Sequence, residues 1–186
     1  VHLFVAAPAE QIRYKLGQTG EGPASRDLAP FPLNATQDFL FAPPSAQTDP
    51  ATQTSLFLAV QGDAAPQSSG QILELSLSEA TASESPSFTS SLVKTTDMAN
   101  TATFSPPSPD PSGLTYLPNS NTLLMSDGEV DETVSGITHF QGANIWQMTL
   151  GGSPVRTANI SKVTPTVMPM TNEPTGVAYD PAQDLY

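Results

Sequence analysis

The chain contains no cysteine among its 186 residues, so neither a disulfide framework nor a thiolate metal site can form. Basic residues are also scarce, because 6 Lys and Arg stand against 18 Asp and Glu and give a formal net charge of −12. This field repels nucleic acid and anionic membrane surfaces, so we expect neither as a partner. A cation, a small ligand or a protein is the expected partner instead.

Long apolar runs are absent as well. No stretch of the sequence approaches the ~20 apolar residues that a membrane helix needs. The first residues, from Val1 to Ala9, lack the basic region and the apolar length of a signal peptide and are expected to form a strand. Because Val1 is not Met and Tyr186 falls inside a repeat, we expect a segment of a longer protein.

Proline and glycine punctuate the whole chain, with 19 and 12 copies respectively. Proline in a helix interior costs about 3 kcal/mol, so long helices are excluded. Between these turn residues lie short apolar runs, for example at residues 56–59, 71–77 and 144–150. The alternation is imperfect in the third run, where Trp146 and Met148 have the opposite phase. This pattern predicts an all-β protein.

A repeat gives the architecture. Residues 110–121, DPSGLTYLPNSN, recur at residues 173–184 as EPTGVAYDPAQD, which is an offset of 63 positions. Each copy has an acid, a Pro-Ser/Thr-Gly turn, a short strand with Tyr and a second turn. Self-similarity at a fixed period is the signature of solenoids, propellers or arrays, and four strands per repeat of about 40 to 60 residues favours a β-propeller.

We therefore predict a partial β-propeller of about three four-stranded blades out of a probable six. The expected boundaries are a blade tail at residues 1–30, blades at 36–100 and 110–165, and the start of a further blade at 173–186. Together these form a single propeller segment over residues 1–186. The Ser- and Pro-rich residues 78–91 and 104–111 are predicted to be surface excursions or connectors between blades.

The strings at residues 111–118, 123–132 and 144–148 resemble six-bladed TolB-like or NHL-like propellers of secreted bacterial proteins, and among them the SdiA-regulated and esterase-like phytase group. In that group a Pro-Ser/Thr-Gly motif opens a blade, as at Pro111, and a Ser-Asp pair ends its second strand, as at Ser126 and Asp127. The resemblance implies six blades and a secreted, extracellular or periplasmic protein. It implies little about activity, because propellers host hydrolases, lyases and binding platforms.

The densest acidic cluster follows the strand at residues 123–126 and contains Asp127, Glu129, Asp131 and Glu132. Calcium takes six to eight oxygen ligands, and Gly128 allows the loop to bend around an ion, although the EF-hand spacing is missing. The sequence is compatible with a Ca²⁺ site here, or with a solvated acidic loop.

Three further residues are candidates for the mouth of a central channel: Asp110 and Glu173, at equivalent repeat positions, and His139 in a long insertion. In a propeller the acids would lie where the innermost strands begin and could hold a cation or a polar ligand. Alternatively, each carboxylate accepts hydrogen bonds from the following turn, and His139 is simply exposed.

No Gly-x-Ser-x-Gly, His-Glu-x-x-His or phosphate-cradling glycine loop is present. We therefore expect an extracellular binding or scaffold module, with Ca²⁺ as a stabilising ion. The alternative is a metal-dependent hydrolase of the phytase or phosphoesterase type, for which the six dispersed basic residues are few.

Overall fold

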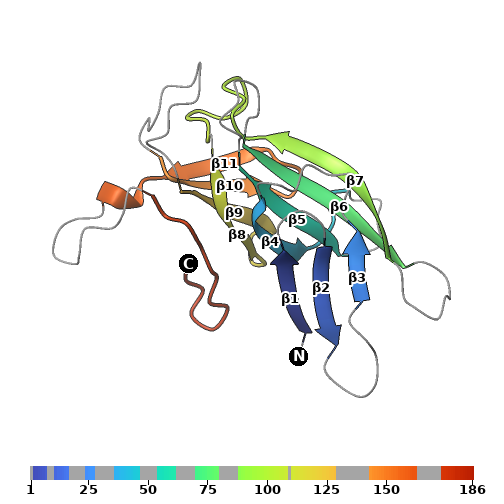
Figure 1. The fold of residues 1–186 in the computed structure, drawn as a ribbon. Coiled ribbons are helices and arrows are strands. Elements are labelled where there is room, and N and C mark those ends of the chain that lie inside the picture. The colour runs from blue at the N-terminus through green and yellow to red at the C-terminus, as the bar shows by residue number, and fades with distance from the viewer. Residues whose placement is uncertain are drawn as a thin grey trace.

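The computed structural model describes residues 2–7, 11–16, 24–27, 36–46, 54–61, 70–79, 88–108, 110–128, 143–162 and 173–186. At residues 2–7, 11–16, 24–27, 77–79, 88–90 and 162 only the backbone is described. The regular structure of the described residues is β-strand with almost no helix, which confirms the all-β part of the prediction (Figure 1).

The strands form three antiparallel sheets in which each strand pairs with its neighbours in the sequence. The first sheet contains β1 (His2–Ala7), β2 (Gln11–Leu16) and β3 (Ala24–Asp27). The middle sheet contains β4 (Thr36–Ala42), β5 (Ser55–Val60), β6 (Gln71–Glu79) and β7 (Phe88–Asp97). The third sheet contains β8 (Pro111–Leu117), β9 (Thr122–Asp127), β10 (Ile145–Thr149) and β11 (Pro154–Ala158), and the 3₁₀ helix η2 (Ile160–Lys162) follows it.

Both faces of the middle sheet are buried. In β5, Phe57 and Ala59 belong to the core that the middle sheet shares with the third sheet, whereas Leu56, Leu58 and Val60 belong to a second core on the opposite face. A strand buried on both faces reads as a continuous apolar run rather than as an alternation. The imperfect phase of the third apolar run has the same cause, because Ile145 and its neighbour Trp146 face different cores.

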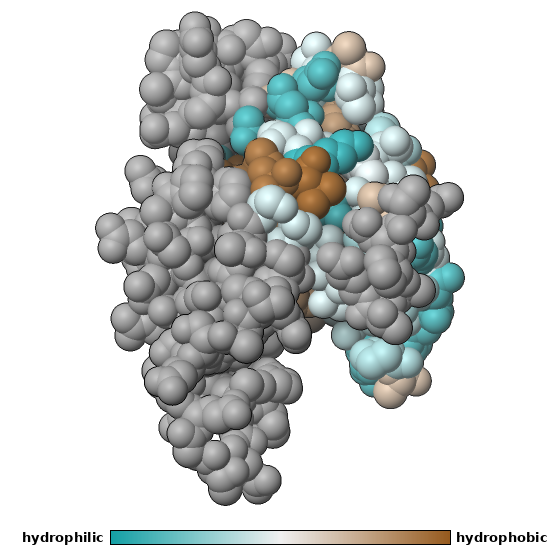
Figure 2. Space-filling model, turned by 90° about the vertical axis from the view of Figure 1, so that its right-hand side faces the viewer, coloured by the Kyte–Doolittle hydropathy of each residue, from teal (hydrophilic) through white to brown (hydrophobic). Residues whose placement is uncertain are grey.

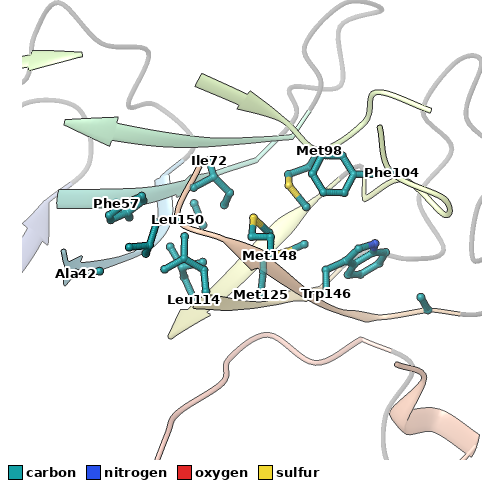
Figure 3. Packing of buried hydrophobic residues seen from close by; sticks show 13 residues of the cluster. Ala42, Phe57, Ile72, Met98, Phe104, Leu114, Met125, Trp146, Met148 and Leu150 are labelled. Atoms are coloured by element: carbon teal, nitrogen blue, oxygen red, sulfur yellow. The ribbon is translucent and has the colours of Figure 1, made fainter. Parts of the chain in front are cut away.

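The largest core lies between the middle and third sheets (Figure 3). Trp146 and Met148 from β10 and Met98 and Phe104 from the connector between the sheets meet there, and the Trp146 indole donates a hydrogen bond to the Pro106 carbonyl at 2.9 Å. The other buried members are Ala42, Phe57, Ala59, Ile72, Leu114, Leu123, Met125, Ala143 and Leu150. Apolar burial of this kind is the main favourable contribution to folding.

The first strands of the two four-stranded sheets share an irregularity. The register of β4 shifts between Thr36 and Asp38, and that of β8 shifts between Pro111 and Gly113. Beyond the shift, the Asp38 carboxylate of β4 accepts a hydrogen bond from the backbone N–H of Leu114 in β8, at 2.7 Å. A side chain from the first strand of the middle sheet thus accepts a hydrogen bond from the backbone of the first strand of the third sheet.

The prediction that residues 78–91 form a surface excursion or connector is wrong at both ends of the segment. Strand β6 continues to Glu79, and β7 begins at Phe88. Residues 91–95 of β7 are exposed, including Leu92 and Val93, so this edge strand carries no buried apolar pattern. On the face seen in Figure 2, apolar residues gather in a patch near the centre, surrounded by hydrophilic and near-neutral residues.

The segment from Glu173 onward differs from the prediction of a further strand. Residues 173–179 form no strand, and the β-structure there is the isolated bridge between Asp180 and Leu185 that closes the second turn. In Figure 1 this segment forms a hook beside the third sheet. A strand requires a partner along its length, and the described residues supply one only at that bridge.

Candidate functional site

Several buried polar residues gather where β8 begins and β9 ends. We call this group, Ser108, Asp110, Ser112, Asp127 and Gly128, the mouth cluster. It forms because the register of the two strands pairs Pro111 with Asp127. The structure therefore brings together Asp110 and Asp127, two of the acids singled out in the sequence.

Asp127 is completely buried and links the connector to the third sheet. Its Oδ2 atom accepts hydrogen bonds from the Ser108 hydroxyl at 2.6 Å and from the backbone N–H of Asp110 at 3.3 Å. Its own backbone N–H donates to the carbonyl of Asn144 at the start of β10. Hydrogen bonds of this kind offset the cost of burying a carboxylate.

Asp110 is 2 % exposed and faces the middle sheet. The side-chain amide of Gln61, which follows β5, donates to its Oδ2 atom at 3.3 Å. The carbonyl of Asp110 accepts from the Ser112 hydroxyl at 3.1 Å and from the Gly128 N–H at 3.3 Å, and Ser112 in turn accepts from Gly128 at 3.0 Å. The cluster thus joins both sheets at one end.

The remaining predicted site residues lie apart from this cluster or outside the described residues. Glu129, Asp131, Glu132 and His139 fall within residues 129–142, which the structure does not describe. Glu173 is half-buried at the start of the C-terminal segment. Among the described residues no group of three or more His, Asp or Glu side chains is arranged to hold a metal, so the calcium site stays a prediction.

The opposite end of the third sheet carries the two repeated turns. Tyr116 donates its hydroxyl to Asn121 at 2.8 Å, and Tyr179 donates to Asp184 at 2.7 Å. Asn119 in the first turn donates to the Tyr179 hydroxyl at 3.0 Å and to the Asp184 carboxylate at 2.9 Å. The repeated turns are therefore hydrogen-bonded to each other.

The two tyrosines titrate at higher pH than usual for different reasons. The hydrogen bond to Asp184 raises the pKa of Tyr179, and burial and the charges of Asp184 and Asp180 add to this effect. Burial raises the pKa of Tyr116. In both cases the neutral phenol is the favoured form.

A cavity of about 320 Å³ opens beside these turns, between the third sheet and the C-terminal segment. Gln147 and Arg156 form one wall, with the Arg156 Nε donating to Gln147 at 2.5 Å. A guanidinium N–H of Arg156 also donates to the Tyr186 hydroxyl at 2.7 Å. A second cavity of about 170 Å³ continues along the sheet past Leu124 and Ile145.

Sequence reasoning missed several of these groups. Arg156 and Gln147 carry no motif, and their pairing depends on the register of β10 and β11. Glu74, which is 2 % exposed, accepts hydrogen bonds from the backbone N–H of Ser45 at 2.9 Å and from the Ser45 hydroxyl. Its position inside an apolar run was a signal of burial, because a Glu in such a run must find partners.

Comparison of the chain with protein-family models, with curated proteins and with solved structures finds no match. In the described part of the chain, no helix has the length and apolar character needed to cross a membrane. The fold itself defines the class: an all-β protein with two four-stranded antiparallel sheets that share a core.

Proposed function

We propose that this chain is part of a β-propeller that serves as an extracellular or periplasmic binding or scaffold module. The observation that carries the proposal is the arrangement of two meandering four-stranded sheets with equivalent bulges in their first strands and a common core. Face-to-face packing of four-stranded units, with the first strands side by side, is the arrangement of propeller blades.

The packing of the C-terminal segment supports a repeating arrangement. Leu114 and Tyr116 of β8 pack into the core on the middle sheet, and Val177 and Tyr179, 63 positions later, pack against the third sheet. The same two side-chain positions thus contact the preceding sheet in both copies. A stack built in this way buries each sheet between its neighbours and leaves loop ends as its variable surface.

The position of the mouth cluster supports the proposal that this end of the stack is the binding surface. The chain leaves β5 at Gln61 and β9 at Gly128 on this side, and the first strands begin there. Asp127 holds the connector in place by accepting hydrogen bonds from the Ser108 hydroxyl and the Asp110 N–H, and Asp110 accepts one from the side-chain amide of Gln61. We place Ca²⁺, as a stabilising ion, at the loop that Asp127 opens, with Glu129, Asp131 and Glu132 as its further ligands.

The experiment that tests the function measures phosphate release. The full chain is incubated with phytate and with p-nitrophenyl phosphate, with Ca²⁺ and with a chelator, and phosphate release is recorded. A binding module releases no phosphate above the protein-free blank. Ca²⁺-dependent release that Asp110→Asn abolishes would replace this proposal with the phosphoesterase, and Asp97→Asn on exposed β7 is the control.

A further inference from the structure

The sequence contains three Asp–Pro peptide bonds, at residues 49–50, 110–111 and 180–181, and the last two lie within the described residues. An aspartyl carboxyl group can attack the main-chain carbonyl carbon of its own residue and close a five-membered ring. Attack within one residue replaces a bimolecular encounter and so lowers the barrier. Proline leaves as a secondary amine, whose nitrogen takes up a proton readily. The surroundings of each bond then decide how fast it breaks.

The Asp110–Pro111 bond is buried in the mouth cluster, and its carboxyl group is held in place. Both residues are buried, with Asp110 only 2 % exposed. The Gln61 amide donates to the Asp110 Oδ2 atom at 3.3 Å, and Gln37 in turn donates to the Gln61 side-chain oxygen at 2.7 Å. A charge that develops in such a buried place interacts with nearby donors more strongly than it would in water.

Two donors point at the carbonyl oxygen of this bond. The Ser112 hydroxyl donates to the Asp110 carbonyl at 3.1 Å, and the Gly128 N–H donates to it at 3.3 Å. The Ser112 oxygen also accepts from the Gly128 N–H at 3.0 Å, which orients the hydroxyl. Attack on the carbonyl carbon would turn this oxygen into an oxyanion and strengthen both bonds. Donors aimed at a developing negative charge form an oxyanion hole.

Breaking this bond would leave the fold in place. Pro111 opens β8 and has no N–H, so separating its nitrogen from Asp110 removes no hydrogen bond of the β8–β9 ladder. The two four-stranded sheets would still share their core, and the Asp38 carboxylate would still accept from the Leu114 N–H. The two fragments should therefore remain associated as a nicked protein.

The Asp180–Pro181 bond has the same chemistry in different surroundings. Its proline is exposed, and both carboxylate oxygens of Asp180 accept hydrogen bonds, from the Ala182 N–H at 2.8 Å and from the Gln183 amide at 3.0 Å. The Asp180 carbonyl accepts from the Leu185 N–H at 3.3 Å, and within the described residues no hydroxyl donates to it. This bond is therefore an internal reference for the effect of the mouth cluster.

We propose that the folded chain cleaves its own peptide bond between Asp110 and Pro111. The protonated Asp110 carboxyl attacks its own carbonyl carbon, so that a C–O bond forms while Ser112 and Gly128 stabilise the oxyanion. The C–N bond to Pro111 then breaks, and the carboxyl proton passes to the proline nitrogen. Water opens the cyclic anhydride and leaves Asp110 as a new C-terminus. Nothing is oxidised or reduced.

The test incubates the full chain at about pH 5, where part of the Asp side chains is protonated, with and without urea. Mass spectrometry follows the fragments that end at Asp110 and at Asp180. In the folded chain the first bond should break at least about tenfold faster than the second, and in urea the two rates should be similar. Ser112→Ala should slow the first cleavage at least about tenfold, and Ser112→Thr should retain it. Ser91→Ala, at an exposed serine of β7, is the control and should change neither rate.

Each outcome decides the proposal. Equal rates at the two bonds of the folded chain would overturn it, and so would unchanged cleavage in a folded Ser112→Ala variant. Trp146 fluorescence shows whether each variant is folded, and the comparison with and without urea uses the unaltered chain. Asp110→Glu, whose attack would close a six-membered ring, should cleave more slowly than the unaltered chain. Cleavage is independent of phosphate release, so failure here and failure of the proposed function are separate results.

Discussion

Asn121 and Asp184 are 63 residues apart and adopt the same left-handed backbone conformation, with φ of 53° at each. Each accepts a hydrogen bond from the tyrosine five residues before it. Asn and Asp tolerate positive φ better than other residues with side chains, because their short polar groups bond locally. The repeat seen in the sequence is thus a repeat of backbone conformation and of a side-chain contact.

Replacement of Asn121 separates these two contributions. Asn121→Gly keeps a residue suited to positive φ and loses only the bond from Tyr116, so it should cost about 0.5–1.5 kcal/mol. Asn121→Ala keeps a Cβ in the left-handed region without the polar group that favours this conformation in Asn, so it should cost about 1–2 kcal/mol more than Asn121→Gly. Urea unfolding monitored by Trp146 fluorescence measures both. Equal costs for the two variants would show that the backbone conformation is not strained.

Gly113 and Gly176 are another pair at the offset of 63, and replacement by Ala should change the stability of the protein at Gly113 but not at Gly176. A Cβ on Gly113 would lie 2.6 Å from the Cα of Gly176 and 2.5 Å from the Ser126 hydroxyl, whereas a Cβ on Gly176 would meet nothing within 4 Å. We expect Gly113→Ala to destabilise the protein by about 1–3 kcal/mol through overpacking. Gly176→Ala is the matched control and should change the urea midpoint little. A tolerated Gly113→Ala would contradict the close approach of these segments.

Removing the Asp38 carboxylate tests the contact between the two four-stranded sheets. Asp38→Ala leaves the N–H groups of Leu114 and Phe39, which donate to the two carboxylate oxygens, without their charged acceptor and should cost about 1–3 kcal/mol. Asp38→Asn keeps one acceptor oxygen and should cost less. Asp97→Ala, which loses a local bond from the Ala99 N–H at 3.0 Å but no bond between sheets, is the control, and all three are compared by urea unfolding. A cost for Asp97→Ala equal to that for Asp38→Ala would argue against a special role for the cross-sheet bond.

Calcium should raise the melting temperature. An ion at one hundred times its dissociation constant adds about 2.7 kcal/mol to the free energy of unfolding. Differential scanning fluorimetry in Ca²⁺ and in chelator measures the shift. The triple variant E129Q/D131N/E132Q should lose it and Asp97→Asn should keep it. An unchanged melting temperature across a Ca²⁺ titration of the unaltered chain would rule out the proposed site.

High pH should destabilise the turn end of the third sheet. The pKa of Tyr179 is raised in the folded state, chiefly by its hydrogen bond to Asp184, so the folded state holds this proton more tightly than the unfolded state does. The stabilisation is present below about pH 10, the ordinary tyrosine pKa, and is lost as pH rises through the folded-state pKa. Urea unfolding from pH 8 to 11 should show this decline.

The variants Tyr179→Phe and Asp184→Asn assign that decline to the pair. Both should make the stability less dependent on pH above about 10, because one removes the phenol and the other removes the carboxylate that raises its pKa. Both variants should still lose some stability at high pH, because burial also raises the pKa of Tyr116. An alkaline slope that neither variant alters would assign it to other groups.

The candidate site was only partly predictable from the sequence. Spacing placed Asp110 at the start of a strand and Asp127 at the end of the next, and an antiparallel pair brings such ends together. That the Asp127 carboxylate turns inward to Ser108, and that Gln61 from another sheet reaches Asp110, depends on how the connector and the sheets pack. These residues are far apart in the sequence, so no local sequence pattern predicts their contacts.

By itself, the sequence determined the all-β class and the repeated turn, because its many prolines and glycines disfavour long helices and because the Tyr–Asn and Tyr–Asp contacts are local. The tertiary structure decided which segments form strands, because strand pairing and packing depend on distant parts of the chain. Strand β7 has no apolar pattern and exists because β6 offers it an edge, whereas residues 173–179 have an apolar pattern but no partner strand among the described residues. A strand forms through hydrogen bonds to another segment, so its own residues cannot specify it alone.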